Sequence, residues 1–189
     1  MVLEKQISTA EEYLAYERAS FDRHEFLFKT IIPKDDSSHS HSIVSGNIAA
    51  QLWCFLKGKK QRVFKTNMRT RNPLNQSYFY PDVVVSDGAP IFADGLNDIL
   101  INPVLIIEVL SPTTAVYDKT DKFVACKSIP TLREYVLVNQ SECDVEIYRR
   151  NADETWSAIR FNKMTDIVSF LSIGFDCPII DFYEGIEAA

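Results

Sequence analysis

Two acidic residues stand in otherwise apolar segments of the sequence, and a lysine follows them along the chain. Asp82 lies within Tyr78–Val85 and Glu108 within Pro103–Leu110, and both segments are predicted to be buried strands. Burying an ionised carboxylate costs on the order of several kcal/mol unless a cation compensates its charge. Two such carboxylates favour a shared divalent cation, and Lys122 supplies a further positive charge. This combination is typical of a metal-dependent phosphodiesterase site.

The two carboxylates suit magnesium in particular. Mg²⁺ takes six oxygen ligands, commonly one or two carboxylates together with waters and a substrate phosphate. A glutamate within one strand and an aspartate at the end of a neighbouring strand provide two such ligands for Mg²⁺ or Mn²⁺. The alternative for Glu108 is a structural pair with an arginine or with backbone donors, and Asp82 after Pro81 is also compatible with a turn or the start of a strand.

Three further acidic or basic positions have both a functional and a structural interpretation. Asp118 and Lys122 are four residues apart, which is the spacing of an ordinary helix-stabilising pair worth a few tenths of a kcal/mol, roughly. On spacing alone, that structural interpretation is favoured. His41 lies near the start of a predicted helix and could hold a phosphate or a water, although a structural role is the simpler alternative. Glu25 opens a predicted strand, where a local pair with Arg23 or a nearby lysine is favoured.

Apolar periodicity and turn residues divide the chain into alternating helices and strands. We predict helices over residues from about 8 to 19, 40 to 57 and 113 to 127. We predict strands over residues 25–32, 61–66, 78–85, 103–110, 134–138, 145–148, 155–161 and 167–171. No repeat or linker interrupts this order, which predicts a single domain over residues 1–189. The expected fold class is α/β or α+β, with a mixed sheet flanked by helices.

Composition limits the class of protein further. The chain has 189 residues, of which 46% are hydrophobic, as in ordinary globular proteins rather than disordered ones. It contains no apolar stretch near eighteen residues and no signal-peptide pattern. These features predict a soluble, cytoplasmic protein that does not act in a membrane.

The positive charges of the chain are unevenly distributed. The net charge is −6, yet no Asp or Glu occurs between residues 37 and 81, which leaves 13 of the 20 basic and all 26 acidic residues elsewhere. A basic strip of this kind could contact nucleic-acid phosphates, and a solvated basic face is an equally good alternative. The strip consists of Lys57, Lys59, Lys60, Arg62, Lys65, Arg69 and Arg71.

The segments around both carboxylates resemble the Uma-type family of restriction endonucleases, within the PD-(D/E)XK nuclease superfamily. The resemblance covers nearly the whole chain, roughly from Ser8 to Tyr183. It rests on Tyr78–Val85, Asn102–Thr113, Tyr117–Lys119, Lys122–Phe123 and Ile129–Tyr135, with Arg23–Glu25, Ser40–Ile43 and Asn47–Ile48 upstream.

This resemblance implies a restriction-endonuclease-like core, with additional β-strands, and a divalent metal. By the resemblance, Asp82 and Glu108 match the metal-binding acids. The superfamily usually places its lysine two residues after the glutamate, where this chain has Leu110. In this family the lysine has moved to the following helix, which points to Lys122 with Asp118 beside it. His41 and Glu25 also match family positions.

Together these features lead to two hypotheses of different classes. The first is a metal-dependent endonuclease that hydrolyses DNA phosphodiester bonds, with His41 and the basic strip contacting the DNA backbone. The second is a catalytically inactive module that keeps the fold and binds nucleic acid or a protein partner. A homodimer is expected if both strands of a duplex are cut, because such cutting needs two sites.

Overall fold

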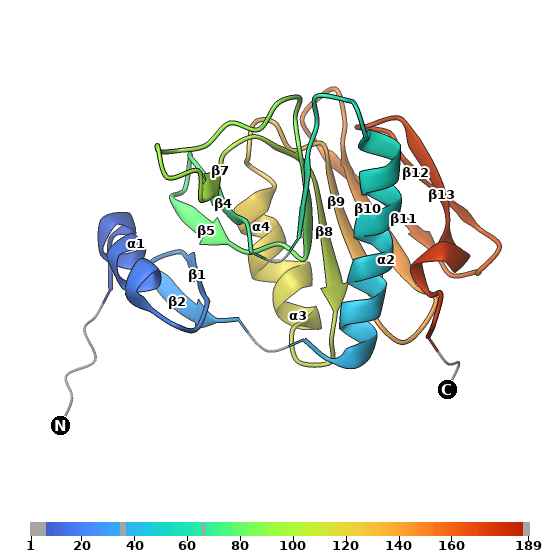
Figure 1. The fold of residues 1–189 in the computed structure, drawn as a ribbon, viewed down its shortest axis with the longest axis horizontal. Helices are drawn as coiled ribbons and strands as arrows, with labels where there is room; N and C mark the ends of the chain where they lie inside the picture. Colours follow the sequence, from blue (N-terminus) through green and yellow to red (C-terminus); the bar gives the residue numbers. More distant parts are fainter. Residues whose placement is uncertain (1–6, 35–36, 66, 187–189) are drawn as a thin grey trace.

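A computed structural model of the protein describes residues 7–34, 37–65 and 67–186. Its centre is a six-stranded mixed sheet with the strand order β11-β10-β9-β8-β6-β3 (Figure 1). Strands β8 and β9 are parallel, and the other neighbours are antiparallel. The strands are β3 (Val63–Lys65), β6 (Val83–Ser86), β8 (Pro103–Leu110), β9 (Glu134–Asn139), β10 (Val145–Arg150) and β11 (Trp156–Phe161).

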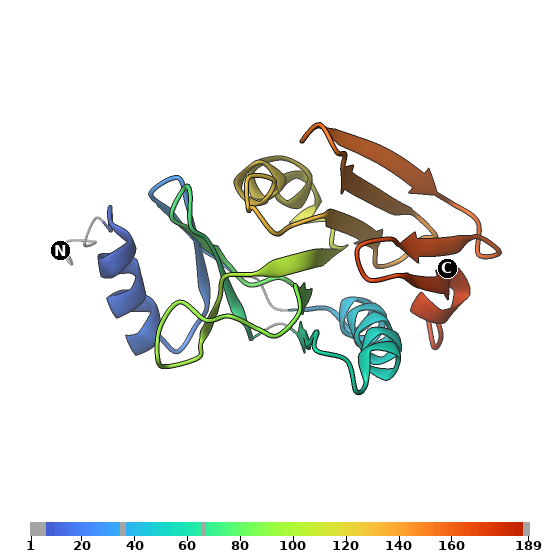
Figure 2. The same ribbon diagram turned by 90° about the horizontal axis from the view of Figure 1, so that it is seen from above.

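A second sheet with the order β2-β1-β5-β4-β7 lies beside the first, toward the N-terminus (Figures 1 and 2). The helix α1 (Ala10–Ala19) packs on it through Tyr13, whose ring stacks on Phe26 with 5.1 Å between centroids. The strands are β1 (His24–Leu27), β2 (Thr30–Pro33), β4 (Arg69–Asn72), β5 (Ser77–Phe79) and β7 (Ile99–Leu100).

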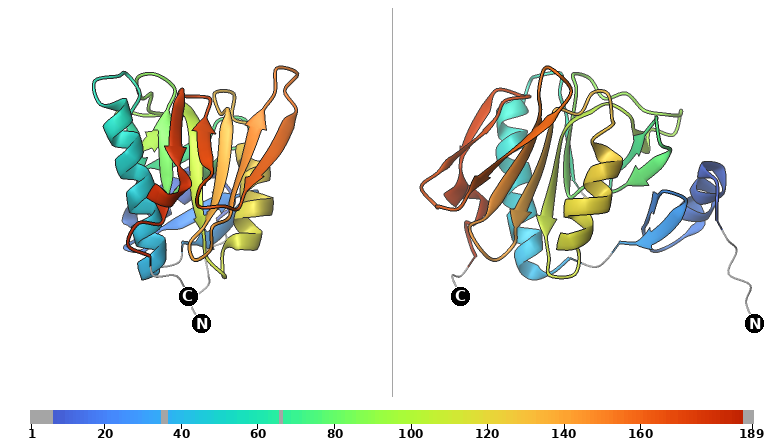
Figure 3. Two further views of the ribbon diagram at one scale, coloured as in Figure 1. Left: turned by 90° about the vertical axis from the view of Figure 1, so that its right-hand side faces the viewer. Right: turned by 180° about the vertical axis from the view of Figure 1, so that it is seen from behind.

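Helices cover both faces of the central sheet (Figure 2). The long helix α2 (His39–Leu56) lies on one face. On the other face lie α3 (Ala115–Tyr117), one π-helical turn (Asp118–Lys122) and α4 (Phe123–Cys126), which connect β8 to the parallel strand β9. A small sheet, β12 (Ile167–Phe170) with β13 (Phe175–Pro178), and a 3₁₀ helix (Ile179–Phe182) lie on the α2 side (Figure 3).

The alternation of side chains along the central strands explains these two layers. Leu105, Ile107 and Val109 of β8 pack into the core under α2, whereas Ile106 and Leu110 pack into the core under α4. Every residue of β8 is buried because both faces of the strand are covered. Glu108 shares its face with Ile106 and Leu110. Its carboxylate therefore points toward the layer that contains Lys122.

The structure confirms the predicted fold class, a mixed sheet flanked by helices, and corrects two predicted strands. Residues 25–32 form a hairpin rather than one strand, and its two-residue turn places Phe28 and Lys29 at φ of 50° and 68°. Residues 78–85 contribute to two different sheets, because Pro81 has no N–H to donate to a ladder and the chain leaves β5 before it enters β6. No helix in the described part of the chain is long and apolar enough to span a membrane.

Candidate active site

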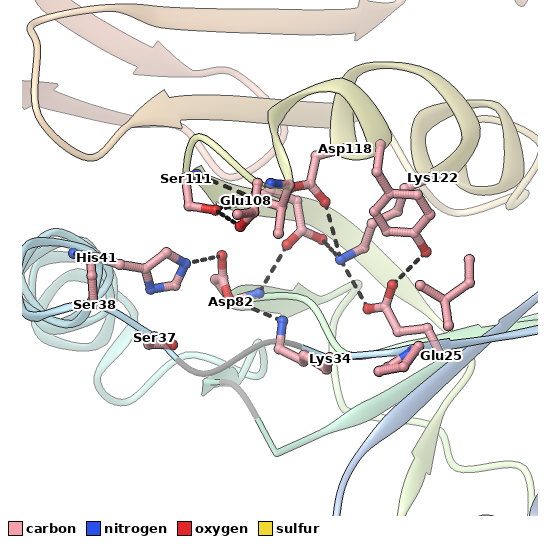
Figure 4. A pocket seen from close by; sticks show the side chains of 15 residues that line it. Glu25, Lys34, Ser37, Ser38, His41, Asp82, Glu108, Ser111, Asp118 and Lys122 are labelled. Carbon is pink, nitrogen blue, oxygen red and sulfur yellow. Dashed lines mark hydrogen bonds and ion pairs between the residues drawn. The ribbon is translucent and has the colours of Figure 1, made fainter.

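A pocket of about 280 Å³ lies where the hairpin, the start of α2 and the end of β8 meet (Figure 4). Its polar lining comes from three parts of the chain, namely residues 25–41, Asp82 and residues 108–122. Glu25 comes from the hairpin, and Lys34 directly follows it. Ser37, Ser38 and His41 lie at or just before the start of α2. Asp82 directly precedes β6, and Glu108 lies in β8. The segment after β8, through α3 and the π-helical turn, supplies Ser111, Thr113, Thr114, Tyr117, Asp118 and Lys122.

The register between β6 and β8 brings the two predicted metal ligands together. Val83 lies opposite Ile107 in this antiparallel pair, so Asp82 and Glu108 are neighbours across the ladder. The amide N–H of Asp82 donates to Glu108 Oε2 at 3.3 Å, and the amide N–H of Val109 donates to Asp82 Oδ2 at 2.9 Å. Both carboxylates are buried. The strand pairing therefore holds both acids in fixed positions on the rigid sheet.

Lys122 lies at the centre of three carboxylates, and its side chain is only 2% exposed. Its Nζ is 2.8 Å from Glu108 Oε1, 3.0 Å from Glu25 Oε1 and 3.6 Å from Asp118 Oδ1. The pair with Asp118 has the predicted four-residue spacing, within the π-helical turn. Single turns of this kind inside helices are frequent at functional sites. The structure thus places beside Glu108 the lysine to which the resemblance pointed.

His41 and Lys34 both contact Asp82. His41 Nε2 lies 3.0 Å from Asp82 Oδ2, while Lys34 donates from Nζ to Asp82 Oδ1 at 3.3 Å and to the carbonyl of Tyr80 at 2.9 Å. The side chain of Ser38 caps α2 by accepting from the amide of His41. The histidine that the sequence singled out is therefore held against the predicted metal ligand.

Glu25 joins the hairpin to the site through contacts that local sequence does not show. It accepts hydrogen bonds from the amide of Tyr80 at 2.8 Å and from the Tyr117 hydroxyl at 2.6 Å, in addition to its ion pair with Lys122. The expected local pair with Arg23 or a nearby lysine is thus replaced by a long-range pair with Lys122. Lys34 and Tyr117 were not predicted as site residues. Lys34 stands in a polar loop segment, and Tyr117 belongs to the matched segment Tyr117–Lys119 but was assigned no role.

The two strand carboxylates have pKa values shifted in opposite directions. Burial alone would raise the pKa of both. At Asp82, the charge of Lys34 and the hydrogen bond with His41 outweigh burial, and the pKa lies below its usual range. At Glu108, burial and the nearby charge of Asp82 outweigh Lys122, and the pKa lies well above its usual range. In the metal-free site, Glu108 therefore holds its proton more tightly than Asp82 does.

The other members of the cluster show similar competition between burial and charge. Burial would lower the pKa of Lys122, but Glu108, Glu25 and Asp118 outweigh it and raise the pKa well above its usual range. The pKa of Asp118 is raised, chiefly by burial. The pKa of Glu25 is lowered, because Lys122 and Lys34 outweigh its burial. Lys122 therefore remains an ammonium group.

The chemistry of the pocket fits a divalent cation. Four carboxylates and two lysines line it, which gives a formal charge of −2 if His41 is neutral. Within residues 7–34, 37–65 and 67–186, no three His, Cys, Asp or Glu side chains form a metal-binding group. This arrangement differs from a closed zinc site and suits Mg²⁺, which uses few protein carboxylates and retains waters. Asp82 and Glu108 would be its carboxylate ligands.

The raised pKa of Glu108 predicts how stability depends on pH. A carboxyl whose pKa is higher in the folded than in the unfolded protein stabilises the fold below its ordinary value of 4.5, and this contribution is lost as the pH rises through the folded pKa. We therefore expect Glu108→Gln to raise the free energy of unfolding of the metal-free protein at pH 7.5 by about 1 kcal/mol or more, because Glu25 and Asp118 still pair with Lys122. The gain over wild type should shrink near pH 4.5 in urea titrations with EDTA. If the variant were more stable than wild type by the same amount at both pH values, the raised pKa of Glu108 would be contradicted.

The basic strip does not line this pocket. Lys57 follows the far end of α2, roughly 24 Å along the helix axis from His41. Arg69 is buried, donates to the Tyr80 hydroxyl at 2.9 Å and pairs with Asp98 at 3.1 Å. The predicted basic strip is therefore wrong at Arg69, because its buried guanidinium group contacts Tyr80 and Asp98. Lys65 in β3 is exposed. Four further exposed bases lie close together just after α2, namely Lys57, Lys59, Lys60 and Arg62.

Comparison with known proteins identifies the family. The model of the Uma2 family, described as "Putative restriction endonuclease", matches residues 10–179. The chain belongs to the Uma2 family. This match confirms the resemblance found in the sequence, and all six candidate residues (Glu25, His41, Asp82, Glu108, Asp118 and Lys122) fall within the matched range.

Two relatives and one solved structure are also similar to this chain over most of its length. The uncharacterized protein sll1609 of Synechocystis sp. is 36% identical over 82% of this chain and 88% of its own length. The uncharacterized protein slr1290 of the same organism is 27% identical over 93% of this chain and 91% of its own length. A crystal structure from Anabaena variabilis, described as a "putative nuclease belonging to DUF820", is 20% identical, with a TM-score of 0.76 over 93% of this chain and 97% of that one. This last similarity confirms the fold.

Proposed function

We propose that this protein is a metal-dependent endonuclease that hydrolyses phosphodiester bonds of DNA. The observation that supports this most strongly is the juxtaposition of two buried carboxylates, Asp82 and Glu108, with the Lys122 ammonium group 2.8 Å from Glu108. The four acidic side chains that line the pocket with two lysines support the same proposal, as does membership of a family described as "Putative restriction endonuclease".

Asp82 and Glu108 would hold Mg²⁺ or Mn²⁺. When bound, such an ion lowers the pKa of a water and neutralises charge that develops on the phosphate. The ladder between β6 and β8 fixes both acids, and His41 holds the Asp82 carboxylate in one orientation through Oδ2. Preorganised ligands of this kind reduce the reorganisation that must accompany the reaction.

Lys122 would position the attacking water and stabilise negative charge on the phosphate. Its pKa is raised by three carboxylates, so it would act as an ammonium donor and not as the base that removes the proton of the water. Glu25 and Asp118 would keep its Nζ beside Glu108, since each lies within 3.6 Å of it. These two acids are thus positioning residues in the proposal.

The proposed substrate is DNA, which would reach the pocket from its open side. The exposed bases at the end of α2 would contact phosphates away from the reacting bond, because they lie roughly 24 Å from His41 along that helix. Salt-dependent binding would follow from such contacts. A homodimer would provide the two sites that cutting of both strands requires.

Cleavage of supercoiled plasmid tests this function. We expect nicking or cutting by the wild-type protein with Mg²⁺ or Mn²⁺, none with EDTA, and none by Glu108→Gln with either metal. Glu142→Gln, an exposed acid outside the pocket, is the matched control and should cut like wild type. Cutting that survives Glu108→Gln would remove the site assignment. DNA binding that needs no metal and is never followed by cutting would favour the inactive binding module.

A further inference from the structure

The two oxygens of the Asp82 carboxylate have different partners. Oδ2 accepts from the Val109 amide at 2.9 Å and contacts His41 Nε2 at 3.0 Å. Oδ1 is 3.3 Å from Lys34 Nζ, and no other contact of this oxygen is found among the described residues. Oδ1 is therefore the oxygen that a ligand could reach without breaking the contacts that orient the carboxylate.

Lys34 and Lys122 are held to different extents. The side chain of Lys122 is 2% exposed and has three carboxylate partners. Moving Lys122 away would leave all three buried carboxylates without this ammonium group. The side chain of Lys34 is 16% exposed and has one carboxylate and one backbone carbonyl as partners. Lys34 directly follows the last strand residue of the hairpin, and its side chain extends from there toward Asp82 (Figure 4). Lys34 is thus the lysine that could move within a folded protein.

We propose that Lys34 is an internal counter-ion that occupies the metal-binding oxygen of Asp82 until a divalent cation displaces it. An ammonium group and a divalent cation would repel each other if both stood at Oδ1. Lys122, by contrast, contacts Glu108, and in the described part of the chain it makes no ion pair with Asp82. This inference rests on the proposed function, because it requires a divalent cation at Asp82.

Displacement would change the role of Lys34 rather than remove it from the site. While Lys34 is in place, its ammonium group, 3.3 Å from Oδ1, compensates the negative charge of the buried Asp82 carboxylate. Once displaced, the ammonium group would remain beside the pocket, where it could pair with a phosphate of the substrate. Lys34 would thus compete with the metal and assist the substrate, and these opposite effects can be separated by experiment.

Titration with Mn²⁺ by calorimetry, without DNA, measures the competition. We expect Lys34→Met to lower the Kd for Mn²⁺ about tenfold, because the ion no longer has to break a charge-assisted hydrogen bond. The matched control is Lys29→Met, which removes one positive charge from the turn of the same hairpin and should leave the Kd within about twofold of wild type. An unchanged or higher Kd in Lys34→Met would overturn the proposal, as would an equal decrease in Lys29→Met.

Lysine reactivity tests the displacement in the unaltered protein. Reductive methylation followed by mass spectrometry should show that saturating Mg²⁺ makes Lys34 react faster while Lys122 stays protected. If Mg²⁺ binds and the reactivity of Lys34 does not rise, Lys34 is not displaced. Circular dichroism of Lys34→Met with and without Mn²⁺ confirms that the variant is folded during the titrations.

The outcomes separate this inference from the proposed function. If neither wild type nor any variant binds Mn²⁺, the metal site fails and the inference fails with it. If wild type binds Mn²⁺ and cuts DNA but Lys34→Met binds no more tightly, only the inference fails. If Lys34→Met binds Mn²⁺ more tightly but no protein cuts DNA, the counter-ion role stands and the endonuclease function fails.

Discussion

Replacing Lys122 with methionine is expected to lower the free energy of unfolding of the metal-free protein by about 3–5 kcal/mol. The substitution leaves the carboxyl groups of Glu108, Glu25 and Asp118 in a buried cluster without the ammonium group that all three contact. The buried carboxyl groups must then either take up protons or repel one another as carboxylates. Either outcome lowers the stability of the folded protein. Urea denaturation at pH 7.5 in EDTA measures the loss.

Two comparisons make this result specific to the buried cluster. Lys119→Met removes a neighbouring lysine whose side chain is 40% exposed and lies 4.0 Å from Glu146, so its effect should be below about 0.5 kcal/mol. Adding Glu108→Gln to Lys122→Met removes one of the carboxyl groups left without a partner and should restore about 1–2 kcal/mol. A loss in Lys122→Met as small as in Lys119→Met would show that the ammonium group does not stabilise the cluster.

The two central carboxylates could be predicted from the sequence because their context is local. Glu108 stands within eight consecutive residues that are all buried in the structure, and an acid in such a run is visible without knowing the fold. The class of fold follows in the same way from apolar strands that alternate with helical segments. The resemblance to a family added what the spacing could not, namely that Lys122 belongs to the site.

The remaining site residues depend on contacts between distant segments. The spacing of Asp118 and Lys122 indicates only a helical pair, since the connection from β8 to β9 decides that this helix lies over Glu108. Glu25 was expected to pair locally, but the hairpin brings it to Lys122 instead. Such long-range pairs follow from the order of strands in the sheets, which apolar periodicity does not specify.

Backbone conformation and burial explain the other differences. The turn at Phe28 and Lys29 has positive φ at two residues that are not glycine, so the usual glycine or asparagine signal of a hairpin is absent. Arg69 lies in a basic stretch of the sequence but is buried by its partners Tyr80 and Asp98. A charge pattern along the chain records the types of residue and not which of them are exposed.

Replacing Asp82 with asparagine is expected to abolish Mn²⁺ binding and to lower the rate of plasmid cleavage by about 10³-fold or more. A metal ion contributes several kcal/mol of charge stabilisation in the transition state, and each 1.36 kcal/mol corresponds to a factor of ten, roughly. Asparagine keeps the size of the side chain but loses the negative charge beside Lys34 and His41. Calorimetry with Mn²⁺ and plasmid cleavage in Mg²⁺ measure the two losses.

Asp118→Asn is the matched comparison, because Asp118 is also a buried aspartate in the pocket but lies against Lys122 and not beside Asp82. Its cleavage rate should fall less than about tenfold, since Glu108 and Glu25 still hold Lys122. The pKa of Asp118 is raised and that of Asp82 is lowered. At neutral pH, neutralising Asp118 should therefore stabilise the metal-free fold and neutralising Asp82 should destabilise it. If both variants lost metal binding and cleavage equally, the assignment of Asp82 rather than Asp118 as a metal ligand would be wrong.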